Sequence, residues 1–211
     1  MIVIKFGGTS VQNEEAIGRV ISIVRSRLKE RPLVVVSALA KVTKLLCLVA
    51  EEAEAQHEDS VKELLRQLRE RHFNLAKALL PANSKLLGNC LEDVERLISE
   101  LGTFVSGVCL IGELSPRSEA RIISTGELLS STIIAYAFNA QGISCNWIDA
   151  RRMITTDDNY LSARPDLEVT EANVKRIVGL ESKGTDLILT QGFIASTVNG
   201  VTSVLGFEGS D

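Results

Sequence analysis

The first ten residues combine the residue types that proteins use to bind an anion. An apolar run, Ile2-Val3-Ile4, leads through Lys5 into Phe6-Gly7-Gly8-Thr9-Ser10. Glycine allows a positive φ and a close approach of backbone N–H groups to phosphate oxygens. The lysine supplies a positive charge that neutralises charge during phosphoryl transfer. The segment therefore indicates a phosphate-binding loop.

A structural explanation of the same residues stays open at this point. A strand followed by two glycines is often a tight turn, and Lys5 is then a solvated residue at the end of a strand. The spacing matches neither the Walker A motif nor the Gly-x-Gly-x-x-Gly dinucleotide fingerprint. The motif alone does not decide between a binding loop and a turn.

The composition excludes several classes of protein. Of the 211 residues, 45% are hydrophobic and 24% are charged, which is typical of a folded globular chain. The net charge of −4 gives no broad basic surface, so we expect no nucleic-acid partner. No apolar run approaches the roughly 20 residues of a membrane helix, and no N-terminal signal segment is present. We therefore expect no membrane partner and a cytoplasmic location.

Cysteine and histidine offer no evident metal site. The four cysteines form no Cys-x-x-Cys pair and only two histidines are present, so we expect no structural zinc. The cysteines are expected to be small buried apolar residues in a reducing compartment. His57 lies in a charged stretch and His72 lies between Arg71 and Phe73, and both are expected at the surface.

Apolar periodicity predicts a strand, helix, strand unit at the start of the chain. The helix begins near Asn13, and the β-branched run from Leu33 to Val36 has the character of a buried parallel strand. Residues 37–43 follow as a loop at the carboxyl end of that strand. Open α/β sheets bind their ligands at this end of the strands.

The region from about residue 44 to 108 is expected to be a helical insertion. Its two apolar stripes, Val61 to Leu79 and Leu87 to Val105, indicate antiparallel helices that either pack on the domain or dimerise. The later elements are a helix from Ser115-Pro116 to about Asn139, a strand over Ile143 to Ile148, a helix capped at Thr170-Glu171, and strands over Asp186 to Thr190 and Val201 to Leu205. This order predicts an α/β fold, a three-layer α/β/α sandwich with an open, mainly parallel sheet.

Three later segments are expected near the same end of the sheet as Lys5. Ser124-Thr125-Gly126-Glu127 lies inside the long helix, while Gln191-Gly192-Phe193-Ile194 and the segment from Gly206 to Asp211 each follow a strand. Taken singly, each has a structural explanation: a glycine packing contact with a surface glutamate in the first, and a turn in the other two. Their joint position at strand ends favours a binding site.

Six motifs follow one another along the whole chain. They are Lys5-Phe6-Gly7-Gly8-Thr9-Ser10-Val11, Val36-Ser37-Ala38 with Thr43, Glu113-Leu114-Ser115-Pro116-Arg117, Gly126-Glu127-Leu128-Leu129-Ser130, Gln191-Gly192-Phe193-Ile194, and Leu205-Gly206 with Gly209-Ser210-Asp211. In this order they resemble the aspartokinases of the amino-acid kinase superfamily. The ordered set distinguishes the chain from sister kinases that act on glutamate, carbamate or nucleotides.

The resemblance implies an amino-acid kinase fold in which residues 1–211 are the N-terminal, amino-acid-binding part of the catalytic domain. The nucleotide-binding half and the regulatory ACT domains of the family lie beyond this part. We therefore expect the chain to be a piece of a longer protein, inactive alone, and the full-length protein to be a homo-oligomer.

The resemblance also implies a reaction and its residues. The γ-phosphoryl group of ATP, delivered with Mg²⁺, is transferred to the side-chain carboxylate of L-aspartate to give 4-phospho-L-aspartate, the first step of lysine, threonine and methionine biosynthesis. Lys5 would stabilise the transferring phosphoryl group, and Asp211 would orient Lys5. The phosphate-binding set is Lys5, Phe6, Gly7, Gly8 and Thr9, and the substrate-binding set is Ser37, Thr43, Glu127, Phe193 and Ser210. Glu127 would bind the substrate ammonium group, and no residue is expected to bind a metal.

One departure from the family pattern bears on activity. Aspartokinases usually show Leu-Gly-Arg-x-Gly-Ser-Asp, whereas this chain has Phe207 in place of the arginine and Glu208 beside it. The lost charge-assisted pair with a carboxylate is worth roughly 1.5–3 kcal/mol. Three explanations stay open: Lys41, Lys44 or Arg164 replaces the arginine, the aspartate affinity is weak, or the protein is a non-catalytic regulatory or interface module. A fused homoserine dehydrogenase, as in some relatives, is a further alternative.

Overall fold

The computed structural model describes residues 1–206. Its strands are β1 (Ile2–Phe6), β2 (Pro32–Val36), β3 (Cys145–Trp147), β4 (Thr155–Thr156), β5 (Leu187–Gln191), β6 (Ile194–Thr197) and β7 (Thr202–Val204). Its α-helices are α1 (Glu14–Ser26), α2 (Val42–Glu54), α3 (Glu58–Leu79), α4 (Lys85–Ile111), α5 (Pro116–Ala140) and α6 (Leu167–Glu181). Short 3₁₀ helices are η1 (Gly8–Val11), η2 (Leu28–Glu30) and η3 (Ala150–Arg152).

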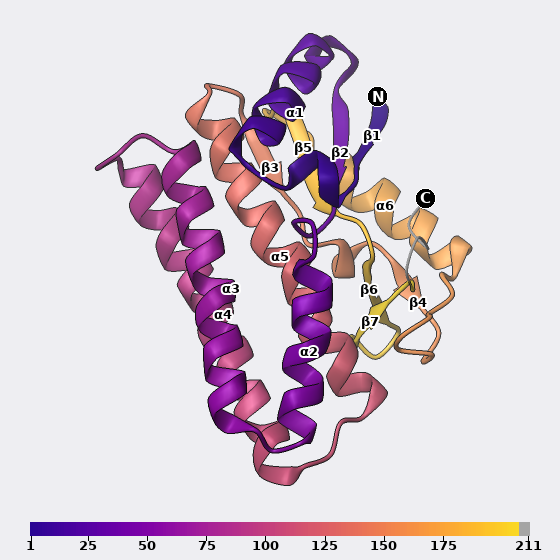
Figure 1. Ribbon diagram of the computed structural model, residues 1–211. Coiled ribbons are helices and arrows are strands. Elements are labelled where there is room, and N and C mark those ends of the chain that lie inside the picture. Colours follow the sequence, from indigo (N-terminus) through magenta and orange to yellow (C-terminus); the bar gives the residue numbers. More distant parts are fainter. Residues whose placement is uncertain (207–211) are drawn as a thin grey trace.

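The main sheet contains four parallel strands in the order β1-β2-β5-β3 (Figure 1). The register pairs Phe6 with Val36 and Val36 with Gln191, so the last residues of three strands lie in one row. We call this end of the main sheet the carboxyl edge. The three loops that follow these strands therefore leave the sheet side by side.

Helices cover both faces of the main sheet. Val34 and Val36 pack in the same cluster as the buried residues of α1 and α5, whereas Leu33 packs with Ile177 and Val178 of α6. Successive side chains of a strand point to opposite faces, so this alternation places α1 and α5 on one side and α6 on the other. The predicted three-layer α/β/α arrangement is confirmed.

A second sheet of three strands was not predicted. In it β4 pairs with β6 in parallel and β6 pairs with β7 antiparallel. The strand predicted over residues 201–205 is present as β7, but assigning it to one sheet with the others was wrong. The chain turns at Gly192 and Phe193 between β5 and β6, which carries β6 and β7 out of the main sheet.

The helices α2, α3, α4 and α5 form a bundle that extends away from the main sheet (Figure 1). Both predicted apolar stripes are buried within it, through residues such as Val61 and Leu68 of α3 and Val94 and Val105 of α4. The explanation that these helices pack on the domain is therefore supported. In the described residues, no helix is both long and apolar enough to cross a membrane.

The start of α6 differs from the prediction. The helix begins at Leu167, and the side chain of Asp166 accepts a hydrogen bond of 3.1 Å from the Val169 N–H. Asp is a favoured N-cap residue, so the cap lies four residues before the predicted one. Thr170 instead lies inside the helix, where its hydroxyl oxygen accepts a hydrogen bond from the Thr155 N–H at 3.1 Å.

His72 is fully buried, so its predicted surface position was wrong. It lies four residues after Leu68 and three before Leu75 on the apolar stripe of α3, a spacing that the sequence already contained. Its Nδ1 lies 2.7 Å from the Leu68 carbonyl oxygen, which assigns the proton of the neutral ring to Nδ1. The four cysteines are free thiols, and the prediction that they are buried holds for Cys90 and Cys109, whereas Cys47 and Cys145 are only half-buried.

Burial of His72 makes the fold sensitive to acid. Burial lowers the pKa of His72 to about 4 from its ordinary value of 6.5. Between these pH values the unfolded chain binds the proton and the folded protein does not, so the contribution of His72 to stability falls as the pH falls. At about 1.4 kcal/mol per pKa unit, we expect this contribution to fall by about 3 kcal/mol between pH 6.5 and pH 4. The His72→Leu variant should lose less stability over this range.

Thermal unfolding at pH 7 and pH 4.5 checks this prediction. The matched control is His57→Leu, because His57 is exposed. Between pH 7 and pH 4.5, His72→Leu should gain stability relative to the wild type, whereas the difference between the control and the wild type should stay constant. An equal change of melting temperature in all three proteins would contradict the prediction.

Candidate active site

Three loops meet at the carboxyl edge and are joined by backbone hydrogen bonds. The Ser37 N–H donates to the Phe6 carbonyl oxygen at 3.2 Å, and the Gly192 N–H donates to the Val36 carbonyl oxygen at 2.9 Å. The Ala40 N–H donates to the Gly8 carbonyl oxygen at 3.2 Å. The segments predicted from Lys5-Phe6-Gly7-Gly8, from Ser37 and from Gly192-Phe193 are therefore neighbours in space.

Gly7 and Gly8 do not use the positive φ that the sequence suggested. Gly7 is extended, with φ −75°, and neither residue is among the positive-φ glycines. A Cβ on Gly8 would lie 3.0 Å from the Ala38 carbonyl oxygen, whereas a Cβ on Gly7 would meet no atom within 4 Å. Gly8 is therefore required for a close backbone contact, and the space beside Gly7 is open to a ligand.

The two glycines predict different effects of an added methyl group. Gly8→Ala should destabilise the protein by roughly 1–3 kcal/mol, because the contact at 3.0 Å is with a backbone atom that must shift. Gly7→Ala should leave the melting temperature unchanged, since its φ suits alanine and the space is open. Both should impair phosphate binding. Equal melting temperatures for the two variants would refute the close-contact explanation.

Glu127 is a buried carboxyl group at the carboxyl edge. Its side chain extends from α5, and only 3% of the residue surface is exposed. Its Oε1 accepts a hydrogen bond of 3.2 Å from the Ala38 N–H, whereas its Oε2 is buried without a partner among the described residues. Burial raises the pKa of Glu127 to about 8. An unsatisfied buried carboxyl oxygen is costly, and its presence points to a cationic group that binds there.

Gly126 brings α5 close to the loop of residues 37–41. A Cβ on Gly126 would lie 3.0 Å from the Ala38 Cβ and 3.1 Å from Val42 Cγ1. The Ser130 hydroxyl, one turn later, donates to the Ser37 carbonyl oxygen at 2.8 Å. The packing explanation of the glycine is therefore correct, and the same contact places Glu127 against Ala38. A surface position for this glutamate is excluded.

The other predicted residues occupy different surroundings. Thr43 lies in the first turn of α2, not in a loop, because the helix begins at Val42. Thr9 is exposed in η1, and Phe193 is buried with a φ of 65°, a conformation that side chains rarely adopt. Ser210 and Asp211 lie outside the described residues.

Lys5 is exposed one residue before the end of β1. The side chains of Ile4 and Phe6 pack in the cluster shared with α1 and α5. Alternation along the strand therefore directs Lys5 toward the opposite face of the sheet, at its carboxyl edge.

The three cations considered as substitutes for the missing arginine are all exposed. Lys41 precedes α2 with a φ of 69°, and Lys44 lies in the first turn of that helix. The backbone N–H of Arg164 donates to the side chain of Asp157 at 3.0 Å. Phe207 itself lies outside the described residues.

Sequence reasoning missed Arg71. Its Nη2 donates to the Ala40 carbonyl oxygen at 2.8 Å, so a side chain from the helical insertion reaches the loop at the carboxyl edge. Arg71 is one of several charged residues on a solvated helix face, and no local pattern distinguishes it. Only the packing of α3 against α2 reveals the contact.

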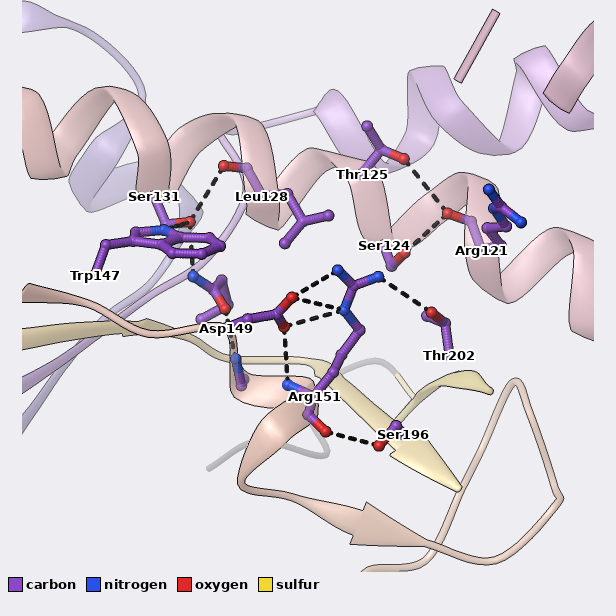
Figure 2. A network of polar contacts seen from close by, with 12 residues as sticks. Arg121, Ser124, Thr125, Leu128, Ser131, Trp147, Asp149, Arg151, Ser196 and Thr202 are labelled. Carbon is purple, nitrogen blue, oxygen red and sulfur yellow. Dashed lines mark hydrogen bonds and ion pairs between the residues drawn. The ribbon is translucent and has the colours of Figure 1, made fainter. Parts of the chain in front are cut away.

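A polar cleft of about 950 Å³ lies on a different face of α5 (Figure 2). Arg151 donates to both oxygens of Asp149, at 2.6–3.1 Å, and to the Thr202 hydroxyl at 3.2 Å. Beside it, Trp147 and Gln191 both donate to the Ser131 hydroxyl oxygen, at 2.8 and 2.9 Å.

No buried polar side-chain atom that lines this cleft lacks a partner in the described part of the chain. Glu127 in contrast has an oxygen without one. The carboxyl edge is therefore the better candidate for the active site. Gln191, part of a predicted motif, ties β5 to α5 and η3.

Metal ligands do not gather within residues 1–206. No group of three or more His, Cys, Asp or Glu side chains in this range could hold a metal ion.

Comparison with known proteins identifies the family. The family model for the amino acid kinase family matches residues 1–211. The aspartokinase of Chlamydia muridarum is 34% identical over 211 residues, which cover 100% of this chain and 43% of that protein. The bifunctional aspartokinase/homoserine dehydrogenase 2 of Zea mays is 29% identical over 208 residues, which cover 98% of this chain and 22% of that protein.

A solved structure agrees with this assignment. Aspartokinase III of Escherichia coli in complex with lysine and aspartate matches with a TM-score of 0.88 at 30% identity, and its complex with aspartate and ADP with 0.87 at 31%. Both matches cover 100% of this chain and 44% of the solved chain. The chain thus spans less than half the length of these relatives. It belongs to the amino acid kinase family.

Proposed function

We propose that the complete protein is an aspartate kinase that transfers the γ-phosphoryl group of ATP to the side-chain carboxylate of L-aspartate. The observation that carries this proposal is the buried carboxyl group of Glu127, with one oxygen unpartnered, next to the loop that begins at Gly7. A substrate that joins an ammonium group to a carboxylate fits this pair of features. Both E. coli complexes contain aspartate and one of them also contains ADP, which supports the same substrates here.

The residues of this chain would act mainly by positioning and by neutralising charge. Two anions, a carboxylate and a phosphoryl group, must approach in line, and no covalent enzyme intermediate is required. Glu127 would bind the ammonium group of aspartate. Because Oε2 is buried, the atoms that cover it must move when aspartate binds. Lys5 would stabilise the transferring phosphoryl group, and the N–H groups of Gly7 and Gly8 would bind its oxygens.

The roles of the other site residues follow from the resemblance to the aspartokinases. Ser37, Thr43, Phe193 and Ser210 would line the aspartate pocket, and Asp211 would orient Lys5. Magnesium would arrive bound to the nucleotide phosphates, where it screens their charge. A homo-oligomeric assembly and a cytoplasmic location stay predictions.

A hydroxamate assay on the complete protein tests the proposal. With ATP, magnesium and aspartate, hydroxylamine should trap an acyl phosphate as a coloured hydroxamate. Glutamate in place of aspartate is the control for substrate identity. Absence of product at saturating aspartate and ATP would refute the proposed reaction.

The phenylalanine at position 207 bears on the alternative of a non-catalytic module. If aspartate binding is weak because a guanidinium is missing, Phe207→Arg should lower the dissociation constant for aspartate at least about tenfold, a change of roughly 1.4 kcal/mol. Calorimetry with aspartate and then with an ATP analogue measures both affinities. Binding of neither ligand by the wild type or by this variant would favour the non-catalytic module.

The Zea mays relative supports a second possibility for the complete protein. Its name joins an aspartokinase with a homoserine dehydrogenase. The kinase reaction proposed here is common to both arrangements.

A further inference from the structure

Arg71 occupies an unusual position among the arginines of α3. Arg66 pairs with Glu63 and Glu70, and Arg69 pairs with Glu95 at 2.6 Å and lies over the Phe73 ring. Arg71 forms no ion pair with any residue in the range 1–206. Among these described residues, its one hydrogen-bond partner is the Ala40 carbonyl oxygen, which accepts from Nη2 at 2.8 Å.

Ala40 connects Arg71 to the glycine loop. The carbonyl group of Ala40 accepts from Arg71, and its N–H donates to the Gly8 carbonyl oxygen at 3.2 Å. A single residue therefore separates the guanidinium group from Gly8. The contact brings a positive charge that has no ion-pair partner within residues 1–206 to the part of the molecule where two anionic substrates are proposed to meet.

The same loop also carries the contact to Glu127. Ala38 donates its N–H to Glu127 Oε1 at 3.2 Å, and its carbonyl oxygen lies 3.0 Å from where a Cβ on Gly8 would be. Lys41, at the end of the loop, has a φ of 69°, which is unfavourable for a lysine. A loop with a strained residue needs external contacts to keep its conformation, and Arg71 supplies one from outside the sheet.

We propose that Arg71 is a positioning residue for the reaction: it holds residues 37–41 against the glycine loop and adds positive charge beside the anionic substrates. The proposal rests on the proposed function for its kinetic consequence, but the effect on the loop is independent of it. The helical insertion is then part of the active site and not only a packing module.

Arginine is suited to this role because its planar group has five N–H donors and stays charged. One donor binds Ala40, and burial lowers the pKa of Arg71 from its ordinary value. Lysine would keep the charge and one donor in a less defined geometry, while methionine would keep only the apolar stem. A comparison of arginine, lysine and methionine at position 71 therefore distinguishes the effects of charge and hydrogen bonding from the effect of packing.

The test compares Arg71→Met and Arg71→Lys with Arg66→Met in the complete protein. Arg66 lies on the same helix, but its partners are two glutamates of α3 itself. Hydrogen exchange of residues 37–43, followed by mass spectrometry, reports on the loop. Steady-state kinetics with aspartate and ATP reports on the reaction.

We expect faster exchange of residues 37–43 in Arg71→Met, with a KM for aspartate raised roughly tenfold and kcat changed less than KM. Arg71→Lys should recover part of both effects, and Arg66→Met should match the wild type. The melting temperatures of Arg71→Met and Arg71→Lys should differ from that of the wild type by no more than the melting temperature of Arg66→Met does.

Unchanged exchange of the loop in Arg71→Met would overturn the proposal, whatever the kinetics show. Faster exchange with an unchanged KM would limit Arg71 to a structural contact and overturn its role in the reaction. A wild-type protein without aspartate kinase activity would instead refute the proposed function. In that case the exchange of residues 37–43 still decides whether Arg71 holds the loop.

Discussion

Replacing Glu127 with glutamine is expected to abolish aspartate binding and, at the same time, to stabilise the folded protein at pH 8. Loss of one partner of a buried charge pair costs about 2–5 kcal/mol, so the affinity for aspartate should fall by roughly 100-fold or more. The variant keeps the shape of the side chain and an oxygen to accept the Ala38 N–H, which in the wild type donates to Oε1 at 3.2 Å. The loss of affinity would therefore follow from the charge and not from a collapsed site.

The gain in stability follows from the raised pKa of Glu127. Burial raises this pKa from its ordinary value of 4.5 to about 8. Between these pH values the folded protein binds one more proton than the unfolded chain, so stability falls as the pH rises from 4.5 to 8 and is level above pH 8. At about 1.4 kcal/mol per pKa unit the fall amounts to several kcal/mol. Glutamine does not ionise, so Glu127→Gln does not undergo this fall in stability.

Two measurements check this prediction. Unfolding by heat at pH 5 and pH 8 should show that the melting temperature of Glu127→Gln rises relative to that of the wild type as the pH increases, because both proteins share the contribution of His72 and only the wild type has that of Glu127. The matched control is Glu113→Gln, since Glu113 is an exposed glutamate before α5. A control that behaves like Glu127→Gln would contradict the assignment.

Aspartate binding to the wild type should also release a proton. At pH 7 the carboxyl group of Glu127 is mostly protonated in the empty site, and the substrate ammonium group favours its ionised form. Calorimetry at pH 7 in buffers of different ionisation enthalpy should give on the order of one proton released per aspartate. Aspartate affinity should then rise from pH 6 to pH 8 and level off. Binding without proton release would show that Glu127 is not the group that meets the ammonium.

Replacing Lys5 with methionine is expected to lower kcat by about 10²–10³ with a small change in the KM for aspartate. A group that stabilises charge developing in the transition state contributes to kcat on this scale. Methionine keeps most of the apolar stem and removes the charge. Lys5 is exposed at the carboxyl edge, so the substitution leaves the buried core of the sheet intact.

The kinetic pattern distinguishes this role from simple attraction of anions. If Lys5 acted only by its long-range field, the KM for ATP would rise, kcat would be unchanged, and salt would mask the effect. The control is Lys29→Met, because Lys29 is an exposed lysine in η2. The hydroxamate assay in low and high salt measures both quantities. An unchanged kcat in Lys5→Met would refute a direct part in phosphoryl transfer.

The layers of the fold could be predicted because they depend on local pattern. The β-branched run of β2 and the apolar stripes of α3 and α4 each specify one type of element, and their order specifies a parallel sheet between helices. The small second sheet could not be predicted in the same way. Its strands β4 and β6 have two and four residues, too few to show a period.

The sequence offers two residues that could cap the N-terminus of α6. Asp166 and Thr170 are both followed by helix-forming residues, and either could accept a hydrogen bond from an N–H of the first turn. The structure uses Asp166 because the hydroxyl of Thr170 is bound to β4, through the Thr155 N–H. That contact joins segments 15 residues apart and is invisible to a local rule.

The chemical types of the candidate site were determined by the sequence alone: a lysine at a strand end, two glycines after it, and a glutamate beside a glycine in a helix. The tertiary structure decided which of them matter and how. It buried Glu127 against Ala38, made Gly8 a close contact instead of a left-handed turn, and brought Arg71 to Ala40 across 31 positions of the chain. The physical reason is that residue type and spacing define local conformation and which contacts are possible. Burial, an unpaired charge and the pKa of a carboxyl group depend on neighbours that only the packing of distant helices and strands provides.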